Sequence, residues 1–359
     1  MAKKHVSIVV PTYNERNNLP ALFGRIGAAM AEDDYEIVLV DDDSPDKTWE
    51  MAADFSRQYP VKVIRRMRDK GLATAVISGI QSSEADIVVV IDADLQHPPE
   101  KIPALVGAID QGADIAIGSR FVKGGRIVDW GLFRYAVSRG ATYIARTFFK
   151  SIQHVNDIQS GFFALRKEIV NVDRLRPLGY KILLEIMIMC DYRKIVEVPI
   201  VFTPRQAGES KLGLANVVDY LRHVMNLAWR TGEFHRFIKF CLIGGLGAVI
   251  NLTATWFLTE TGTFYYLVSG AIGIELGILS NFILNKLWTF QDVKISGIKA
   301  VGKAFLKDQL VRSVGLAANL FILWIMTEYF TVYYLYSQMT GVFLVAVWNF
   351  SGNKWFTWE

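Results

Sequence analysis

Five short apolar runs recur in the first 120 residues, with stretches of helical periodicity between them. The runs are Val6–Val10, Glu36–Val40, Val61–Ile64, Asp86–Ile91 and Asp114–Ile117. Their starts lie 25 to 30 residues apart, which is the length of a strand with a crossover helix. Continuous rather than alternating apolarity is typical of strands that are covered on both faces. The pattern therefore predicts a doubly wound, mainly parallel α/β sheet in the front of the chain.

Four longer apolar segments fill the end of the chain, and each is long enough to cross a bilayer as a helix. They are Phe240–Leu258, Phe264–Asn285, Gln309–Thr327 and Tyr329–Asn353. Glu275 is an ionisable residue inside the second span, where we weigh a buried hydrogen bond equally against a functional role. The chain thus divides into an α/β domain (1–211), a connecting stretch (212–236) and a four-span transmembrane domain (237–359).

The connecting stretch has apolar residues at helical spacing, among them Val217, Leu221 and Val224. Such a helix lies either on a membrane surface or against the front domain. Its position directly before the first span favours the membrane surface.

The four spans are two copies of one hairpin. A shift of 68 residues aligns Asn251 with Asn319 and Asn281 with Asn349, and it also aligns two Tyr-Tyr-Leu segments. Repeats of two helices keep the same orientation in a membrane, so the duplication is parallel. We expect the paired asparagines to join helices rather than to do chemistry.

Charge separates the same two regions. Residues 236–359 carry only 15 charged side chains, although the chain has 39 Lys and Arg and 35 Asp and Glu. The net charge of +4 excludes a polybasic nucleic-acid binder, and two cysteines exclude a disulfide framework. Four lysines, Lys294, Lys299, Lys303 and Lys307, follow the second span, whereas the short loops after spans one and three have no Lys or Arg. The positive-inside rule then predicts that both termini and the α/β domain are cytosolic.

Polar residues follow four of the predicted strands. These clusters are Pro11–Glu15, Asp41–Asp46, Asp92–His97 and Gly118–Arg120. Ligands bind at the carboxyl ends of the strands in such sheets, so the clusters should meet in one crevice. No glycine-rich phosphate loop is present, which disfavours dinucleotide-binding and P-loop proteins. Asp94 and Gln96 alternate with Leu95, so their oxygens should share one face of an extended segment and suit Mg²⁺ or Mn²⁺.

Six motifs in order across residues 5–213 resemble glycosyltransferase family 2 with the GT-A fold. They are PTYNE, VDDDSPDKT, DADLQHPPEKIP, GSRFVKGG, QSGFFALRKE and RQAGESKLG, and within the family they are most similar to dolichyl-phosphate mannose synthases. The end of the chain resembles the small four-helix membrane proteins of polysaccharide and lipid-linked glucose pathways.

The resemblance implies roles for named residues. Asp94 and Gln96 would bind the metal, and Asp92, Asp94, Arg120 and Arg205 would be the catalytic residues. Donor contacts are implied for Pro11, Tyr13, Glu15, Val40, Asp42, Asp92, Ala93, Asp94, Arg120, Arg205 and Lys211.

The acceptor site follows from charge and resemblance together. A lipid phosphate needs a basic pocket, and we assign it to Arg120, Arg134, Ser138 and Arg205. Other cations nearby, Lys123, Arg126 and Arg146, are interpreted as a solvated face. Asp157 stands at a family position, where either a catalytic or a loop-organising role is open.

The activity that the resemblance implies is transfer of mannose from GDP-mannose to dolichyl phosphate. A phosphate monoester is mostly dianionic at neutral pH and can attack the anomeric carbon directly, without a general base. Direct in-line attack should invert the configuration of that carbon. The expected partners are this nucleotide sugar, a polyprenyl phosphate and the bilayer, with no nucleic acid, while self-association is left open. Alternatives are UDP-glucose or another donor, and a lipid-linked sugar flippase with a regulatory front domain. A processive polysaccharide synthase is disfavoured, because Asn226–Arg230 lacks the expected QxxRW-like pattern.

Overall fold

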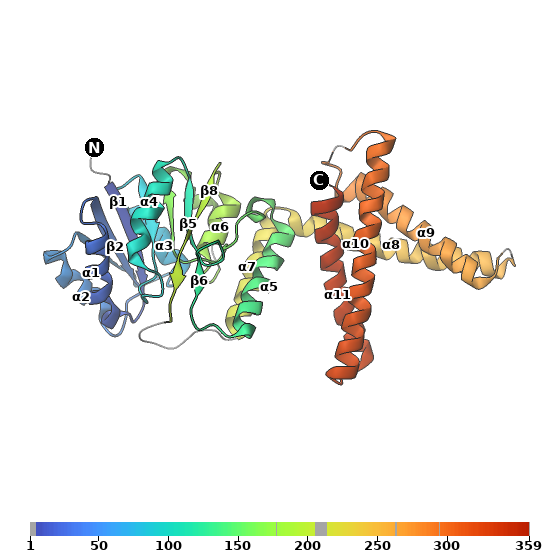
Figure 1. Cartoon of the computed structure of the whole chain (residues 1–359), viewed down its shortest axis with the longest axis horizontal. Coiled ribbons are helices and arrows are strands. Elements are labelled where there is room, and N and C mark those ends of the chain that lie inside the picture. Colours follow the sequence, from blue (N-terminus) through green and yellow to red (C-terminus); the bar gives the residue numbers. More distant parts are fainter. Residues whose placement is uncertain (1–4, 177, 205–213, 263, 294, 359) are drawn as a thin grey trace. The chain divides into compact units, whose positions relative to one another are not determined.

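The computed structural model describes residues 5–176, 178–204, 214–262, 264–293 and 295–358 (Figure 1). The chain forms two compact units, Met1–Leu227 and Ala228–Glu359. The first is the α/β unit and the second is the membrane unit. The sequence predicted domain limits at residues 211 and 236, with membrane association beginning near residue 212. These limits remain a proposal.

A mainly parallel sheet of seven strands forms the α/β unit, in the order β3-β2-β1-β4-β7-β5-β8. Only β7 runs antiparallel to its two neighbours. All five predicted strands are present, and a second small sheet pairs β6 with β9. The strands are β1 (His5–Thr12), β2 (Asp34–Asp41), β3 (Val61–Arg65), β4 (Ile87–Val90), β5 (Ile115–Ser119), β6 (Arg126–Ile127), β7 (Phe163–Arg166), β8 (Ile195–Pro199) and β9 (Val201–Phe202).

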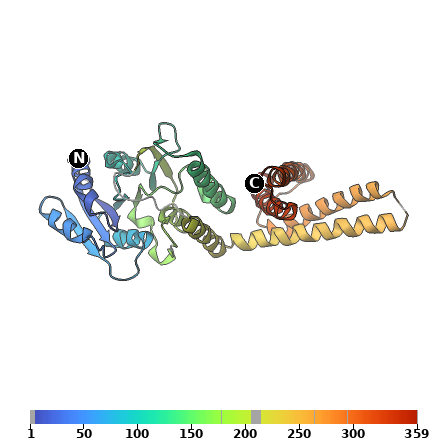
Figure 2. The same cartoon turned by 90° about the horizontal axis from the view of Figure 1, so that it is seen from below.

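Helices cover both faces of this sheet (Figures 1 and 2). Ile8 and Val10 of β1 pack with Phe23 of α1 in the main core, whereas Val9 faces α3. Gly79 of α3 lies so close to Val9 that a Cβ there would meet it at 2.3 Å. The helices of the unit are α1 (Leu19–Ala29), α2 (Thr48–Asp54), α3 (Leu72–Ser82), α4 (Ile102–Asp110), α5 (Leu132–Phe148), α6 (Ile182–Met189) and α7 (Leu214–Arg230).

Helix α7 has two apolar stripes. Tyr220, Val224 and Leu227 are buried, and the Tyr220 hydroxyl donates to the carbonyl oxygen of Ala141 in α5 at 2.9 Å. Val218 and Met225 are exposed. The helix therefore packs on the α/β unit, and contact of its exposed apolar side chains with a membrane surface stays a prediction. The helix ends at Arg230, and the next helix begins at Glu233, within the stretch predicted for interface helices (212–236).

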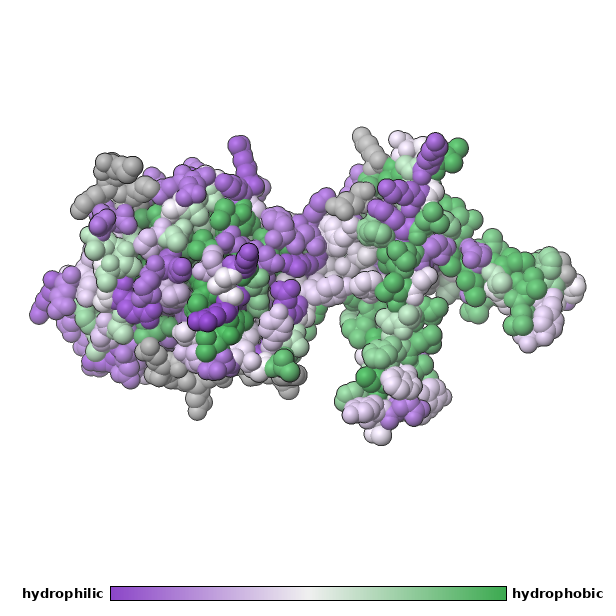
Figure 3. Space-filling view, in the orientation of Figure 1, coloured by the Kyte–Doolittle hydropathy of each residue, from purple (hydrophilic) through white to green (hydrophobic). Residues whose placement is uncertain are grey.

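In its described residues, the membrane unit contains four long helices, α8 (Glu233–Glu260), α9 (Tyr266–Leu284), α10 (Ile298–Trp324) and α11 (Tyr334–Gly352). Figure 3 shows apolar residues covering much of the outer surface of these helices. The first three, with the turns that follow α9 and α10, are long and apolar enough to cross a membrane. The fourth spans 19 residues without a charge but includes Ser, Thr, Gln and Asn. The four predicted spans thus correspond to the four helices.

Several boundaries in this unit differ from the prediction, and α8 already begins at Glu233 rather than at Phe240. Three of the lysines that the sequence assigned to a loop, Lys299, Lys303 and Lys307, lie on the first turns of α10. Lys294 lies outside the described residues. The fourth helix begins at Tyr334 rather than at Tyr329, because a π-helical turn (Ile325–Tyr329) and a short loop end the third.

The two hairpins pack internally through equivalent asparagines and glycines. A Cβ on Gly247 of α8 would lie 2.2 Å from Oδ1 of Asn281, and one on Gly315 of α10 would lie 2.6 Å from Oδ1 of Asn349. These pairs are related by the 68-residue shift. Small residues let helix backbones approach closely in membranes, so the asparagines act in helix packing, as expected from the repeat.

The hairpins pack on each other with the same symmetry. Phe282 of the first contacts Phe305 of the second, and Phe350 of the second contacts the equivalent Phe237 of the first. Phe290 stacks on its repeat mate Trp358, with ring centroids 5.6 Å apart. A residue and its repeat mate thus exchange roles across one interface, as in a two-fold symmetric dimer.

Candidate active site

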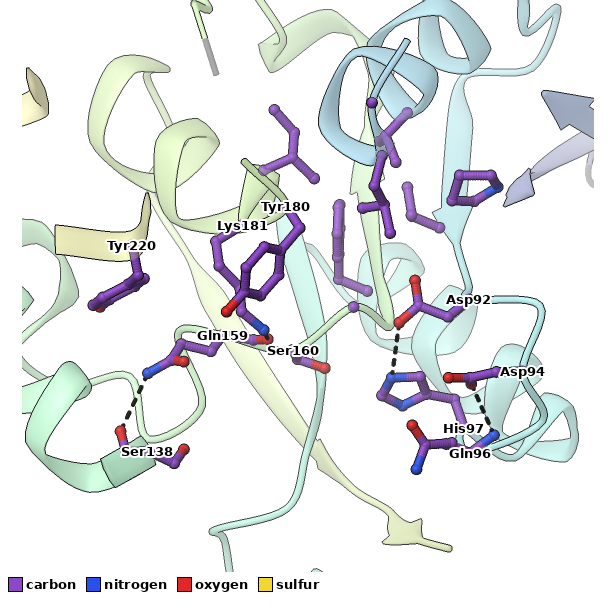
Figure 4. A pocket seen from close by; sticks show the side chains of 18 of the residues that line it. Asp92, Asp94, Gln96, His97, Ser138, Gln159, Ser160, Tyr180, Lys181 and Tyr220 are labelled. Atoms are coloured by element: carbon purple, nitrogen blue, oxygen red, sulfur yellow. Dashed lines mark hydrogen bonds and ion pairs between the residues drawn. The ribbon is translucent and has the colours of Figure 1, made fainter. Parts of the chain in front are cut away.

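A cavity of about 840 Å³ opens at the carboxyl ends of the strands of the α/β unit. Figure 4 shows polar side chains from the turn after β4, the loop before β7 and helix α5 converging on it. Most residues predicted for the site line this one cavity: Pro11, Tyr13, Glu15, Asp42, Asp92, Ala93, Asp94, Gln96, Arg120, Arg134 and Ser138.

Of the remaining predicted residues, only Val40 can be placed, and it does not line the cavity. Val40 is fully buried in β2, and its carbonyl oxygen accepts a hydrogen bond from Thr12, so its side chain belongs to the core. Arg205 and Lys211 lie outside the described residues, and their roles remain predictions.

The turn after β4 carries the acidic end of the cavity. The alternation of Asp94 and Gln96 predicted an extended segment, and this prediction is wrong. The chain turns at Leu95, whose φ is +60°. The side chain of Leu95 is buried in the core, which offsets the cost of about 1 kcal/mol for this backbone conformation. Oδ1 of Asp94 accepts the backbone N–H of Gln96 at 3.1 Å, and this bond closes the turn.

Glycine is required where the loop before β7 passes Asp92. A Cβ on Gly161 would lie 2.2 Å from Oδ2 of Asp92. The same carboxylate lies 3.5 Å from Nε2 of His97, whose ring packs between Phe162 and Phe202. The QSGF motif therefore makes room for the first aspartate of the DAD motif.

Asp94 and Gln96 offer a small set of oxygen donors. Nε2 of Gln96 donates to the carbonyl oxygen of Thr203 at 3.1 Å, so the amide nitrogen is engaged with the backbone. Within the described ranges, no three His, Cys, Asp or Glu side chains gather as a metal cluster. Two oxygen donors fit a Mg²⁺ or Mn²⁺ ion whose remaining positions are completed by phosphate oxygens, because such ions commonly bind through one or two protein ligands.

Asp42 is tied to the loop after β3. Its carboxylate pairs with the Arg66 guanidinium and accepts the backbone N–H of Gly71 at 2.6 Å. The neighbouring Asp43 pairs with Arg65 and Lys70 instead. The third acidic residue of this turn thus holds the loop and does not line the cavity.

A buried ion pair organises the basic end of the cavity. Nε and Nη2 of Arg120 each donate to the Asp157 carboxylate at 2.7 Å, and Asp157 also accepts the backbone N–H of Arg120. Burial raises the pKa of Asp157, but the guanidinium outweighs it and leaves this pKa below its ordinary value. Asp157 therefore organises the site by fixing Arg120, and Nη1 of Arg120 is the guanidinium nitrogen not engaged by this carboxylate.

The other cations near this end separate into two groups. Arg134 lines the cavity, and its guanidinium lies 4.3 Å from the ring centroid of Trp130. Lys123 and Arg126 are exposed, as expected for a solvated face. Arg146 is half-buried, and its guanidinium donates to the carbonyl oxygen of Val155 after α5, so it does not belong to a fully solvated face.

Comparison with known proteins agrees with this geometry. The model of glycosyl transferase family 2 matches residues 7–172, and that of the GtrA/DPMS transmembrane domain matches residues 239–358. A dolichol-phosphate mannosyltransferase of Pyrococcus furiosus is 44% identical over 98% of this chain and 99% of its own length. The chain belongs to glycosyl transferase family 2.

Two further likenesses are more distant. A polyprenol monophosphomannose synthase of Mycolicibacterium smegmatis is 34% identical over 58% of this chain and 82% of that protein. The crystal structure of a mycobacterial protein superimposes with a TM-score of 0.50 at 18% identity, covering 64% of this chain and 76% of that one. The last likeness concerns the fold alone. The protein is thus a glycosyltransferase with a transmembrane domain.

One lysine that lines the cavity of this glycosyltransferase was not predicted from the sequence. Lys181, just before α6, lines the cavity, and its Nζ donates to the carbonyl oxygen of Gln159 at 2.9 Å (Figure 4). The pKa of Lys181 is lowered to about 8, mainly because the ammonium group is buried and secondly because the positive charge of Arg120 is near. Gln159, Trp130, Tyr180 and Tyr220 also line the cavity and were not foreseen. Only Gln159 stands in a quoted motif, QSGF, and that position was the one available signal.

Proposed function

We propose that the protein transfers mannose from GDP-mannose to the phosphate of a dolichyl or other polyprenyl lipid, with inversion at the anomeric carbon. The observation that carries this proposal is a single cavity with an acidic end at Asp92 and Asp94 and a basic end at Arg120 and Arg134. One end suits a metal-bound sugar diphosphate, and the other suits a second anion. The Pyrococcus furiosus relative, named a dolichol-phosphate mannosyltransferase, supports the choice of sugar and acceptor.

Donor binding is assigned to the strand ends. Pro11, Tyr13, Glu15 and Asp42 border the cavity on the side of β1 and β2, where the nucleoside would lie. Asp92 and Ala93 would contact the sugar diphosphate, while Asp94 and Gln96 would hold Mg²⁺ or Mn²⁺. The ion, when bound, would neutralise charge on the diphosphate. The proposal also keeps Val40, through its backbone, and Arg205 and Lys211 as further donor contacts.

The acceptor phosphate is the nucleophile in this proposal. Arg120, Arg134, Ser138 and Arg205 would orient it toward the anomeric carbon, so that repulsion between the two anions is offset by guanidinium groups. An acceptor oxygen forms a bond to the anomeric carbon as the bond to the diphosphate oxygen breaks. The nucleoside diphosphate leaves with the electron pair, and no proton needs to move in this step.

Asp157 supports this step without touching substrate. By holding Nε and Nη2 of Arg120, it keeps the guanidinium plane fixed beside the cavity. Trp130 and Phe202 pack near the same guanidinium, at 5.3 and 5.2 Å from their ring centroids. An immobile donor needs no reorganisation as charge develops, which is how preorganised sites stabilise a transition state.

The proposal includes the membrane topology. The α/β unit, both termini and the Lys299–Lys307 face of α10 would be cytosolic, where soluble nucleotide sugars are found. Cysteines introduced at Lys299 and in the loop after α8 should label from opposite sides of sealed vesicles. Labelling of both from the same side would contradict this arrangement.

A donor assay tests the proposed function. The purified full-length protein, Mn²⁺ and a polyprenyl phosphate are incubated with labelled GDP-mannose or labelled UDP-glucose. We expect a mannosyl lipid product from the first donor, little product from the second, and loss of transfer with a chelator. Preferred transfer from UDP-glucose would reject the sugar assignment, and activity unaffected by the chelator would reject the metal.

A further inference from the structure

Lys181 occupies the middle of the cavity wall, between its acidic and basic ends. The residue precedes α6, and its ammonium group is held by the carbonyl oxygen of Gln159 and by the Tyr180 ring, whose centroid lies 4.7 Å away. Figure 4 shows its side chain extending toward the loop of Gln159 and Ser160. Both partners are uncharged. They hold the ammonium group in place but do not neutralise its positive charge.

Gln159 connects this lysine to the helix that carries the acceptor residues. Its Nε2 donates to the carbonyl oxygen of Ser138 at 3.2 Å and to Oγ1 of Thr142 at 3.3 Å, both on α5. The backbone and the side chain of one residue therefore bridge Lys181 to α5. The ammonium group is thus fixed relative to α5, the helix that carries Ser138 and Arg134.

Charges around Lys181 come from four parts of the fold. Arg120 follows β5 and Arg134 lies on α5, and both repel the ammonium group, whereas Asp92 after β4 and Asp157 before β7 attract it. Asp157 is already paired in a bidentate manner with Arg120. The Arg120–Asp157 pair is balanced, so Arg134 and Lys181 remain as two cations against Asp92, and the positive excess suits a phosphate anion.

We propose that Lys181 contacts the phosphate of the polyprenyl acceptor directly and holds it together with Arg134 and Ser138. This inference rests on the proposed function for the acceptor, but not on the identity of the sugar. A further cation makes chemical sense here because a phosphate monoester carries close to two negative charges at neutral pH. The ammonium group adds a point charge beside the planar guanidinium groups.

Equilibrium binding of farnesyl phosphate to the full-length protein tests the proposal. Lys181→Met should weaken binding about 10- to 100-fold, the usual loss for a charged hydrogen bond, while Lys181→Arg should stay within a few-fold of wild type. Farnesol, which lacks the phosphate, should bind all three proteins equally. The matched control is Lys167→Met, because Lys167 also donates to a backbone carbonyl, that of Ser83, but does not line the cavity.

Steady-state kinetics separate a contact with substrate from a structural role. Lys181→Met should raise the KM for the lipid phosphate and leave the KM for the nucleotide sugar unchanged. The acceptor kcat/KM of the wild type should fall as pH rises through about 8, because Lys181 loses its proton there. The acceptor itself is already dianionic above pH 7. In Lys181→Arg this fall should be absent, since arginine stays charged.

Several results would overturn the proposal. Unchanged farnesyl phosphate binding in Lys181→Met would do so, as would an equal rise in both KM values. Should Lys181→Met fail to fold, Lys181→Arg decides, because a loss of binding in that charged variant would show that positive charge is not what matters. A wrong sugar in the proposed function leaves the binding test intact. A wild-type protein that binds farnesol and farnesyl phosphate equally would reject both the acceptor and the role of Lys181.

Discussion

The cavity of the α/β unit and the paired hairpins of the membrane unit bury polar side chains in opposite ways. In the cavity, charged groups come from different elements, and none has a repeat mate. In the hairpins, uncharged asparagines lie against glycines, and the Gly247–Asn281 and Gly273–Asn251 contacts both recur after 68 residues. Asymmetric charge suits two different substrates, whereas symmetric packing suits an anchor. The contrast predicts that variants of the cavity change transfer and that variants of the hairpins change stability.

The largest effect on transfer is expected for Asp94→Asn. The amide oxygen can still accept the Gln96 N–H, so the turn should persist, while the proposed metal ligand loses its charge. We expect transfer to fall about 10³-fold, corresponding to about 4 kcal/mol of lost transition-state stabilisation. Rate measurements at saturating Mn²⁺, with circular dichroism as the check on folding, test this.

Asp54→Asn is the control for that variant, since Asp54 is exposed on α2 and does not line the cavity. Its rate should equal that of wild type. An Asp94→Asn protein with full activity would remove Asp94 from the metal site.

Asp157→Asn should affect both transfer and stability. The substitution leaves the Arg120 charge buried and unpaired, at a cost of about 3–5 kcal/mol. We expect a clear drop in melting temperature and a fall in transfer of about 10²-fold, because Arg120 is no longer held. Thermal melting and rate measurements on the same preparation check both effects.

The exposed pair of Asp191 with Arg174 is the matched control. Asp191→Asn should change neither quantity measurably, because exposed ion pairs contribute little. If Asp157→Asn lowered the melting temperature but left the rate intact, the positioning role of Asp157 would be wrong.

Arg134→Gln should separate the two ends of the cavity. Loss of the proposed charged contact to the acceptor should raise the KM for polyprenyl phosphate about 10- to 100-fold and leave the KM for the nucleotide sugar unchanged. Arg126→Gln removes an exposed arginine outside the cavity and should have no effect. Equal changes in both KM values for Arg134→Gln would mean that the ends do not bind separate substrates.

The smallest effect is expected in the membrane unit. A Cβ on Gly273 of α9 would lie 2.6 Å from the backbone oxygen of Asn251, so Gly273→Ala must push α8 and α9 apart. The cost of such overpacking is about 1–3 kcal/mol, and a melting temperature lower by a few degrees should result. Gly270→Ala on the same helix has open space and should be neutral or stabilising. Both variants should keep wild-type KM values, and altered kinetics in Gly273→Ala alone would give the hairpins a catalytic role.

The sequence predicted the elements better than the contacts between them. The strands and spans were readable because their apolar runs are long and continuous, and burial on both faces requires such runs. The turn at Leu95 could not be predicted from the sequence. Leucine rarely adopts a left-handed backbone conformation, and here burial of its side chain in the core offsets the cost. The start of α10 was predicted wrongly, because its lysines were interpreted as part of a loop. They lie instead on helical turns that precede the apolar span.

Long-range partners account for the rest of the site. Arg120 and Asp157 were each singled out, but their pairing across 37 residues depends on how β5 and the loop before β7 meet. Lys181 stands in a stretch without a pattern of its own, and only the fold brings it beside Gln159. Residues whose role comes from one distant partner leave no periodic or compositional signal.

The anomeric configuration of the product tests the central claim most directly. Direct attack by the acceptor phosphate inverts the donor carbon, so α-linked GDP-mannose should give a β-linked mannosyl phosphate lipid. NMR coupling constants of the purified product of the full-length enzyme, Mn²⁺ and farnesyl phosphate would show it. A β-linked product agrees with one displacement across the cavity, and an α-linked product would contradict it.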